Sequence, residues 1–482
     1  MLERVSPRRV YFIGSICTAL GLGYVSLAIG KFLPTNPASM AIMFFVANFG
    51  TACYAQAATM LAVRNFPSAD RGKVAGLIKC VFGLSSGILG VLYAGLFKSQ
   101  MVGRFLLMLS MGVPLLGVLT SIPLNLVPAK HLSYAMERAQ GVSPRMAPFY
   151  IWFAVIILVL VAAMLAGAFP VSLPVPWTGV IIVTLVLAVL GLPMLYGRIY
   201  VRDGVLGCGP GDFSVHGSSD GHVEDDTNFA NDSSEGLRLE DDLLEGEAFP
   251  LLRAPGNVGD CRTLDLACSN MTWRQCIQDG RFWALYVAFL CGAGSGLIVI
   301  NNVASLADTL GMASSNMLVT ALGLSNALGR LSAGWTSDRV VSAGFPRAIL
   351  FCTMLLATCG VDFLLAAGVK DLLYPLCVAA GICYGSMFAL VLALAGDLFG
   401  VEHIGTNYGL LDLGPALGSF VFATGVVNFF YSRQGDGGTC IGPQCFGGTF
   451  FCAAIACLLA CILVYVVLVR PSFKNRIRRS EE

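Results

Sequence analysis

Three charged side chains lie inside long apolar stretches of this sequence, where a charge is energetically unfavourable. Arg330 lies within the apolar run that begins near residue 316, and Lys79 and Asp412 lie within two others. A charge at the centre of a bilayer costs roughly 3 kcal/mol or more, so such residues usually face a partner or a water-filled path. A guanidinium binds a carboxylate through a planar fork of donors, a desolvated lysine can bind an anion, and a lone carboxyl can carry a proton. Arg330 and Lys79 are therefore candidates for anion binding, and Asp412 is a candidate for proton coupling.

Each of these residues also has a structural alternative. Arg330 is about six residues, or roughly 9 Å, from the end of its run, so it could extend to the interface and pair there. Lys79 and Asp412 could form a static pair between two halves of the protein, or each could pair with a neighbour. For Asp362, a further acid in the ninth apolar stretch, a structural role is favoured.

The composition indicates a protein that lies mostly in a lipid bilayer. Of 482 residues, 56% are hydrophobic and 12% are charged, and the mean hydropathy is +0.75, unlike a soluble domain. A spanning helix needs about 20 mostly apolar residues. Twelve stretches reach that length, so we expect an all-α, polytopic membrane protein with about twelve transmembrane helices. The stretches are residues 10–30, 40–63, 74–97, 104–127, 148–169, 177–197, 282–304, 316–336, 347–369, 372–396, 405–430 and 448–469.

A polar stretch divides the chain. Residues 198–281 are rich in Gly, Ser, Asp and Glu and lack a periodic apolar face, so we expect an acidic, disordered linker. It separates an N-terminal bundle (residues 1–197) from a C-terminal six-helix bundle (residues 282–470), which a basic tail (residues 471–482) follows. Basic residues concentrate in one set of loops, which predicts that both termini and the linker are cytosolic.

Other classes of function find no support in the residues. The net charge is +1 and no basic, aromatic-interleaved patch exists, so no nucleic-acid partner is expected. Four histidines are scattered over loops without metal-ligand spacing and nothing resembles an enzyme's site, so we expect no metal, no cofactor and no enzymatic activity. Most of the 17 cysteines lie in apolar runs as small hydrophobes. Only Cys440 and Cys445, in a polar loop on the non-cytosolic side, are placed for a disulfide.

Two short matches suggest an internal repeat, which is how transporter folds are built. In the register that they define, the first span corresponds to the third helix of an N-terminal half. The chain would then lack two initial helices, and the fifth and sixth spans would be two extra ones. The alternative is coincidence, with two halves of six helices each. The matches are Glu3-Arg4 and Pro7-Arg8 with Asp338-Arg339 and Pro346-Arg347, and Gly72, Gly76 and Lys79 with Gly405, Gly409 and Asp412.

The end of the span that carries Arg330 resembles a known signature. Gly334-x-x-x-Asp338-Arg339 is similar to the cytoplasmic loop between the second and third helices of each half in the major facilitator superfamily. The resemblance implies a cytoplasmic gate, where a small residue permits close helix approach and charges hold neighbouring helix ends together. We assign Gly334, Asp338, Arg339 and Arg71 to this gate.

Further motifs resemble the nodulin-like branch of that superfamily, over nearly the whole chain. Its members normally begin with two more helices, which is where this sequence departs. The resemblance implies a membrane transporter fold and gives little on substrate. The motifs are Asn65-Phe-Pro67, Arg71-Gly72, Gly76, Ile78-Lys79, Gly83-Leu84-Ser85, Asn301-Asn302, Asp397-Leu-Phe-Gly400 and Gly405-Thr406.

The run from Asn326 to Gly334 is similar, more distantly, to the eighth helix of monocarboxylate and oxalate–formate transporters. In those families an arginine four residues before the small residue contacts the substrate carboxylate, which implies that role for Arg330. Polar side chains within the spans complete an expected cavity, although helix–helix hydrogen bonding is the simpler role for any one of them. Those assigned to substrate binding are Asn326, Asn301, Asn302 and Tyr384; Asn48, Tyr54, Gln56, Asn407 and Tyr408 also lie in spans.

These observations favour a secondary transporter that moves a small organic solute, such as a carboxylate anion, by alternating access, with a proton as a possible co-substrate. The alternative is a non-transporting membrane sensor or scaffold that keeps the fold and signals through the linker. Glu247, Leu251 and Leu252 resemble an acidic dileucine signal that sorting adaptors read. The expected location is therefore the plasma membrane or a vacuolar or endolysosomal membrane.

Overall fold

The computed structural model describes residues 7–33, 36–65, 71–96, 101–121, 270–311, 316–434 and 440–473, which are predominantly helical. All of these residues belong to one compact unit. The expected spans 148–169 and 177–197, and residues 198–269 with Glu247, Leu251 and Leu252, lie outside the described residues. The ten other expected spans each overlap a described helix or helix run, and residues 122–127 of the span 104–127 lie outside the described residues.

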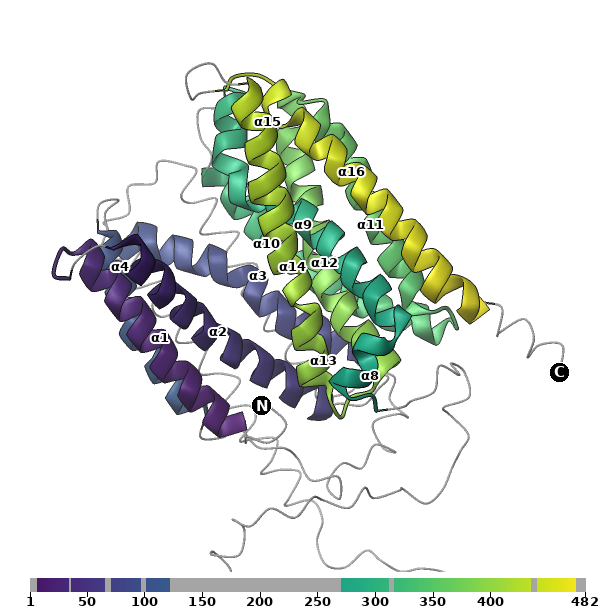
Figure 1. The fold of residues 1–482 in the computed structure, drawn as a ribbon, viewed down its shortest axis with the longest axis horizontal. Coiled ribbons are helices and arrows are strands. Elements are labelled where there is room, and N and C mark those ends of the chain that lie inside the picture. Colours follow the sequence, from purple (N-terminus) through teal and green to yellow (C-terminus); the bar gives the residue numbers. More distant parts are fainter. Residues whose placement is uncertain are drawn as a thin grey trace, which may run out of the picture. The chain divides into compact units, whose positions relative to one another are not determined.

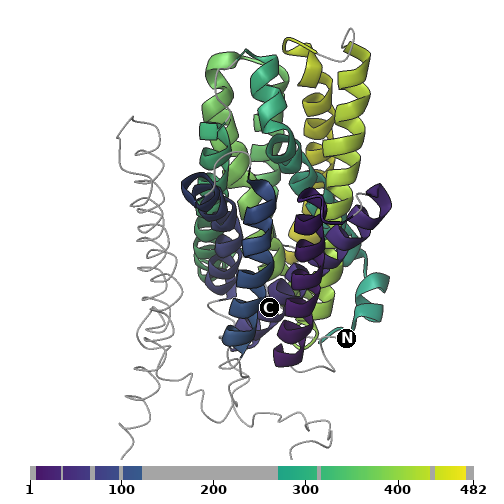
Figure 2. The ribbon, with the colours of Figure 1, turned by 90° about the vertical axis from the view of Figure 1, so that its left-hand side faces the viewer.

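Four helices form the N-terminal group: α1 (Pro7–Ile29), α2 (Pro37–Asn65), α3 (Arg71–Leu96) and α4 (Val102–Ser121). Helix α1 packs against both α2 and α4 (Figures 1 and 2). Helix α3 packs mainly along α10 and α12 of the C-terminal group. Helix α3 therefore places side chains from the first half of the sequence against helices from the second half.

The C-terminal group contains the remaining described helices. They are α8 (Trp273–Gln278), α9 (Gly280–Thr309), α10 (Asn316–Ser342), α11 (Arg347–Ala366), η3 (Lys370–Leu372), α12 (Leu373–Phe399), α13 (Ile404–Leu411), α14 (Leu413–Gly418), η4 (Ser419–Val426), α15 (Val427–Gln434), α16 (Gln444–Val464) and η5 (Tyr465–Val469).

The end of the linker differs from the expectation of disorder up to residue 281, because α8 and the start of α9 occupy its last residues. Thr272 and Gln275 form a capping box at the start of α8, a local Thr-x-x-Gln signal that composition does not reveal. Asp279 caps α9 by accepting the main-chain N–H of Arg281 at 2.8 Å. Partial burial alone would raise the pKa of Asp279. The hydrogen bonds that its carboxylate accepts from the main chain and the side chain of Arg281 hold that pKa below its ordinary value.

Eight helical segments in the described part of the chain are long and apolar enough to cross a membrane. Helices α3 and α10 are not among them, although they have 26 and 27 residues; they are the helices that carry Lys79 and Arg330. The eight are Pro7–Ile29, Pro37–Leu61, Val102–Ser121, Gly280–Thr309, Arg347–Ala366, Lys370–Phe399, Ile404–Arg433 and Gln444–Phe473.

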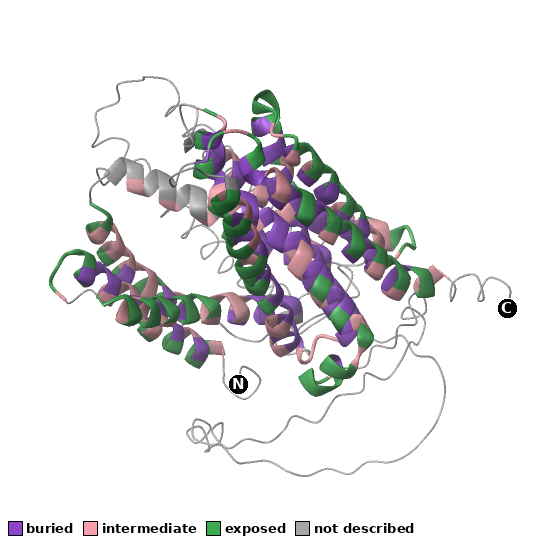
Figure 3. Cartoon of the chain, turned by 45° about the horizontal axis from the view of Figure 1, so that its top comes forward, coloured by how far each residue is buried: buried purple, intermediate pink, exposed green. Residues whose placement is uncertain are grey.

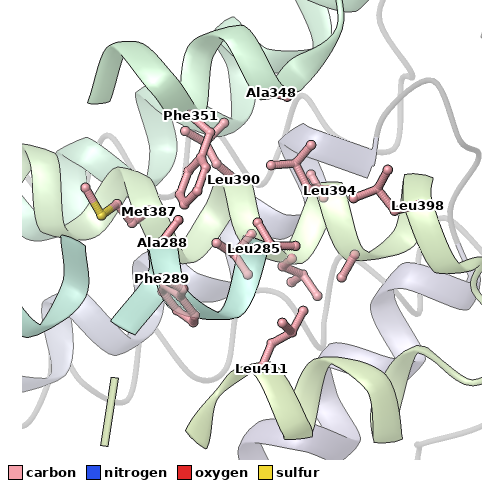
Figure 4. Packing of buried hydrophobic residues seen from close by; sticks show 14 of the residues in the cluster. Leu285, Ala288, Phe289, Ala348, Phe351, Met387, Leu390, Leu394, Leu398 and Leu411 are labelled. Carbon is pink, nitrogen blue, oxygen red and sulfur yellow. The ribbon is translucent and has the colours of Figure 1, made fainter. Parts of the chain in front are cut away.

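The hydrophobic core lies around α12, which is buried along most of its length. Met387 and Leu390 of α12 belong to one cluster with Phe289 of α9 and Phe351 of α11 (Figure 4). Buried positions concentrate among the C-terminal helices, whereas α2 and α4 expose many apolar side chains (Figure 3). Exposed apolar surface of this kind suits helices in contact with lipid.

Candidate functional site

Arg330 is buried between α3, α10 and α12, with a side chain that is 5% exposed. Its Nε donates a hydrogen bond to Oδ1 of Asn326, one turn earlier in α10, at 2.9 Å. Its guanidinium donates a second hydrogen bond, at 3.0 Å, to the main-chain carbonyl of Lys79 in α3. The guanidinium carbon lies 4.5 Å from the ring centroid of Phe388 and 5.9 Å from that of Tyr384, both on α12. Neutral groups thus hold the guanidinium in place.

Lys79 is also buried, with 3% of its side chain exposed. Its Nζ lies 4.3 Å from the ring centroid of Tyr408 on α13 and 5.5 Å from that of Phe82 on its own helix. A cation over an aromatic face gains about 2 kcal/mol or more when both are desolvated. Aromatic rings therefore replace part of the hydration that this ammonium has lost.

Asp412 lies at a break in a transmembrane helix run. Helix α13 ends at Leu411 and α14 begins at Leu413, because Pro415 has no N–H to donate and its ring would clash with the carbonyl of Leu411. The carboxylate of Asp412 accepts the hydroxyl of Tyr408 at 3.1 Å and the amide of Gln56, from α2, at 3.3 Å. The main chain at Asp412 keeps helical dihedral angles, so the helix run bends here without unwinding.

We call Lys79, Asn326, Arg330, Tyr384, Tyr408 and Asp412 the central cluster. Lys79, Arg330 and Asp412 interact electrostatically, yet none of the three forms an ion pair within 4.0 Å with any residue that the structure describes. The cluster therefore has two buried cations and one partly exposed carboxyl. An incoming anion would balance the excess of positive charge, and the low local dielectric would strengthen its attraction.

Glycines bring the two halves close enough to form this cluster. A Cβ on Gly76 would lie 2.6 Å from the carbonyl oxygen of Arg330 and 3.1 Å from Cα of Gly334. A Cβ on Gly334 would collide with the carbonyl oxygen of Gly72. Only glycine fits at this crossing of α3 and α10, which agrees with the close-approach role expected for Gly334.

Asp338, at the same crossing, caps the start of α3. Its carboxylate accepts the main-chain N–H groups of Gly72 and Lys73 at 2.9 and 2.8 Å. It also accepts Arg347 at 2.6 Å, in an ion pair whose side chains are 4% and 3% exposed. A carboxylate at a helix N-terminus satisfies unpaired donors and the helix dipole together.

Arg347 extends the contact to a third helix end. Its Nε donates to Asp397 of α12 at 2.7 Å, and Arg71 donates to the same carboxylate at 2.5 Å. We call Arg71, Asp338, Arg347 and Asp397 the gate network. It joins the start of α3, the end of α10, the start of α11 and the end of α12, so these four ends lie on one side of the bundle.

Arg339, assigned to the gate from its sequence, makes a different contact. It is exposed and stacks on the ring of Trp335, 3.4 Å from the centroid. Arg347 and Asp397 occur within the sequence motifs but were assigned no role in the site there, and Phe388 was not named. The signal for the first two was present as charges at the ends of apolar spans.

The structure does not bring Asn301 and Asn302 into the central cluster. Asn301 is exposed and donates to Ser419 at 3.1 Å, and Asn302 donates to the carbonyl of Ala423 at 3.2 Å. Both acceptors lie in the π-helical segment η4: one is the side-chain hydroxyl of Ser419 and the other is the main-chain carbonyl of Ala423. Asp362, on α11, is buried and accepts the hydroxyl of Ser295 at 2.6 Å.

Cys440, in the loop that leads into α16, forms a disulfide with Cys445 in the first turn of that helix. No group of three or more His, Cys, Asp or Glu residues within the described ranges has the arrangement of a metal site.

Comparison with known proteins gives matches over both halves. The family described as nodulin-like matches residues 1–195, and the Major Facilitator Superfamily matches residues 263–482. Among individual proteins, the chain is 26% identical over 208 residues to Protein NUCLEAR FUSION DEFECTIVE 4 of Arabidopsis thaliana, covering 40% of this chain and 36% of that protein. It is 27% identical over 246 residues to Probable transporter MCH1 of Saccharomyces cerevisiae, covering 49% of each. The chain thus spans about half or less of the length of these curated relatives.

A crystal structure of the E. coli fucose:proton symporter is also similar, with a TM-score of 0.45 and 13% identity over 96% of this chain and 85% of that one. The apolar helices and the two family matches define an integral, multi-pass membrane protein with the major facilitator fold. Within this fold, residues 1–195 are similar to the nodulin-like family, and residues 263–482 to the Major Facilitator Superfamily.

Proposed function

We propose that the protein is a secondary transporter that carries a small organic anion, such as a carboxylate, by alternating access. The observation that carries this proposal is the charge balance of the central cluster, in which Arg330 and Lys79 are buried beside the single carboxyl of Asp412. A guanidinium held by neutral acceptors keeps its charge for a ligand, and its planar donors match a carboxylate.

Each central residue has a role in this proposal. Arg330 and Lys79 bind the anion, Asn326 orients the guanidinium, and Tyr384 forms part of the wall. Asp412 carries a co-transported proton, because an ionised carboxylate would repel the anion that its protonated form accepts. Asn301 and Asn302 lie along the outer part of the substrate path. The relatives named as probable transporters agree with transport as the activity.

The gate network closes one end of the path in this proposal. Asp338 and Gly334 hold α3 against α10, Arg71 holds α3 against Asp397 of α12, and Arg339 stays at the surface near them. We propose that this end faces the cytosol, since the basic loops lie there, and that Glu247, Leu251 and Leu252 are read by sorting adaptors. Alanine at Leu251 and Leu252 would then move the protein from a vacuolar or endolysosomal membrane to the plasma membrane.

Uptake of labelled monocarboxylates into proteoliposomes that contain the purified chain tests the proposal. We expect saturable uptake that Arg330→Ala abolishes. Arg433→Ala is the matched control, because that arginine is exposed and stacks on Phe429. Equal uptake by Arg330→Ala and the parent would remove Arg330 from the site. Failure to take up any organic anion would favour a sensor or scaffold that keeps the fold.

A further inference from the structure

Tyr408 connects two charged groups of the central cluster. It is fully buried, and its ring lies beneath the ammonium of Lys79, 4.3 Å from Nζ to the centroid. Its hydroxyl donates to Oδ1 of Asp412 at 3.1 Å. The ring face of Tyr408 thus contacts Lys79, the proposed anion-binding residue. Its hydroxyl contacts Asp412, the proposed proton carrier.

Local helix geometry fixes this arrangement. Tyr408 and Asp412 are four residues apart, so they lie on the same side of α13. The main-chain N–H of Asp412 also bonds to the carbonyl of Tyr408 at 2.8 Å, at the junction of α13 and α14. The tyrosine therefore stays aligned with the carboxyl even though the helix is interrupted there.

The other groups that face Asp412 come from four further helices. They are Gln56 of α2, which donates an amide hydrogen bond, Lys79 of α3, Arg330 of α10 and Tyr384 of α12, all of which interact with it electrostatically or by hydrogen bonding.

We propose that Tyr408 is the positioning residue that couples binding of the anion at Lys79 to protonation of Asp412. This rests on the proposed function. In the empty site the ammonium above the ring strengthens the phenol as a donor, and the donated bond favours the ionised carboxylate. A bound anion draws the ammonium toward itself and weakens that donor. Asp412 then takes a proton from water on the open side of the membrane, and the neutral carboxyl no longer repels the anion.

Reciprocity makes the proposal measurable. If the anion promotes protonation, protonation must tighten anion binding by the same factor. The half-saturating anion concentration should fall as the pH falls, by at most about tenfold per pH unit for one proton, and level off once Asp412 is protonated. Tyr408 should set the pH midpoint of that change.

The test compares pH profiles of anion uptake in proteoliposomes for the parent and Tyr408→Phe, which keeps the ring and removes the hydroxyl. Without the donated bond the ionised carboxylate loses a stabilising contact, so the pH midpoint of uptake should move up. At a pH below both midpoints the half-saturating concentration should stay within about twofold, because the ring still faces Lys79. Tyr431→Phe is the matched control; its hydroxyl accepts the main-chain N–H of Cys440, and the midpoint should stay unchanged.

A double variant distinguishes coupling from a general structural role. Asp412→Asn should flatten the pH profile, and adding Tyr408→Phe should then change nothing further. If Tyr408→Phe does not fold, Lys79→Met makes the same test from the other side of the ring and should also move the midpoint up. A parent-like midpoint in a folded Tyr408→Phe, with a pH-dependent parent, would overturn the inference alone. A parent that takes up no anion at any pH would overturn the proposed function itself.

Discussion

The guanidinium of Arg330 donates a hydrogen bond to the main-chain carbonyl of Lys79, 3.0 Å away. This bond links α10 to α3 and places two cationic residues from the two halves of the sequence next to each other. Because the acceptor is a neutral main-chain carbonyl, the bond neutralises neither side-chain charge. Substitution of the Lys79 side chain leaves its carbonyl, and hence the position of Arg330, in place.

We therefore predict a graded response at this pair. Lys79→Met should raise the half-saturating anion concentration roughly tenfold or more, which is the value of one charge-assisted hydrogen bond, while some transport remains. Concentration-dependent uptake measures this. Lys370→Met is the control, because that exposed lysine bonds only to the carbonyl of Gly311 among the described contacts, and its variant should behave as the parent does. Unchanged affinity in Lys79→Met would exclude an ionic role for Lys79.

The glycine crossing should tolerate no side chain. Gly76→Ala places a methyl group 2.6 Å from a main-chain oxygen of α10, and overpacking of this kind costs about 1–3 kcal/mol. We expect lower stability in detergent and reduced uptake. Gly360→Ala is the matched control on α11, where a Cβ meets nothing within 4 Å, and it should be neutral or slightly stabilising. Equal losses in both variants would contradict a specific role for the crossing.

Apolar runs and intramembrane charges were sufficient to predict much of the molecule. The ten expected spans within the described residues are helices, and the side chains of Arg330, Lys79, Asn326, Tyr384 and Asp412 meet in one cluster. A charge in lipid must find neighbours, so its presence in the sequence already indicates where helices converge.

The pairing of charges at helix ends was not predictable in this way. Asp338 is followed directly by Arg339, but adjacent residues on a helix point in directions about 100° apart and do not face each other. The partner of Asp338 is Arg347, nine residues on, and a second carboxylate reaches that arginine from Asp397, fifty residues further. Such pairings depend on the packing of α10, α11 and α12, which local sequence does not encode.

The gate network should respond cooperatively to substitution. Asp338→Asn leaves the buried Arg347 with one carboxylate, and breaking a buried pair costs about 3–5 kcal/mol. Arg347→Gln should cost a similar amount, and the double variant should cost less than the sum of the two. Denaturation in detergent measures the free energy of unfolding of all three variants.

The control is Arg281→Gln, at the more exposed pair with Asp279, which should cost about 1 kcal/mol or less. Additive effects of Asp338→Asn and Arg347→Gln would argue against a network.

The disulfide between Cys440 and Cys445 offers a test of stability and of membrane orientation together. It closes a short loop, and reduction of such a disulfide should lower the free energy of unfolding by about 2 kcal/mol in the chain-entropy account.

Disulfides persist in oxidising surroundings, so the loop should face the outside or a lumen, opposite the gate network. In protein sorted to the cell surface, a membrane-impermeant reductant should expose these thiols to an impermeant label before permeabilisation. In the variant with Cys440→Ser and Cys445→Ser, reductant should add no label and should leave the stability unchanged. Labelling that requires permeabilisation would reverse the orientation and with it the placement of the gate. Carbohydrate on Asn270, which precedes Met271-Thr272 and so fits the glycosylation acceptor pattern, would do the same.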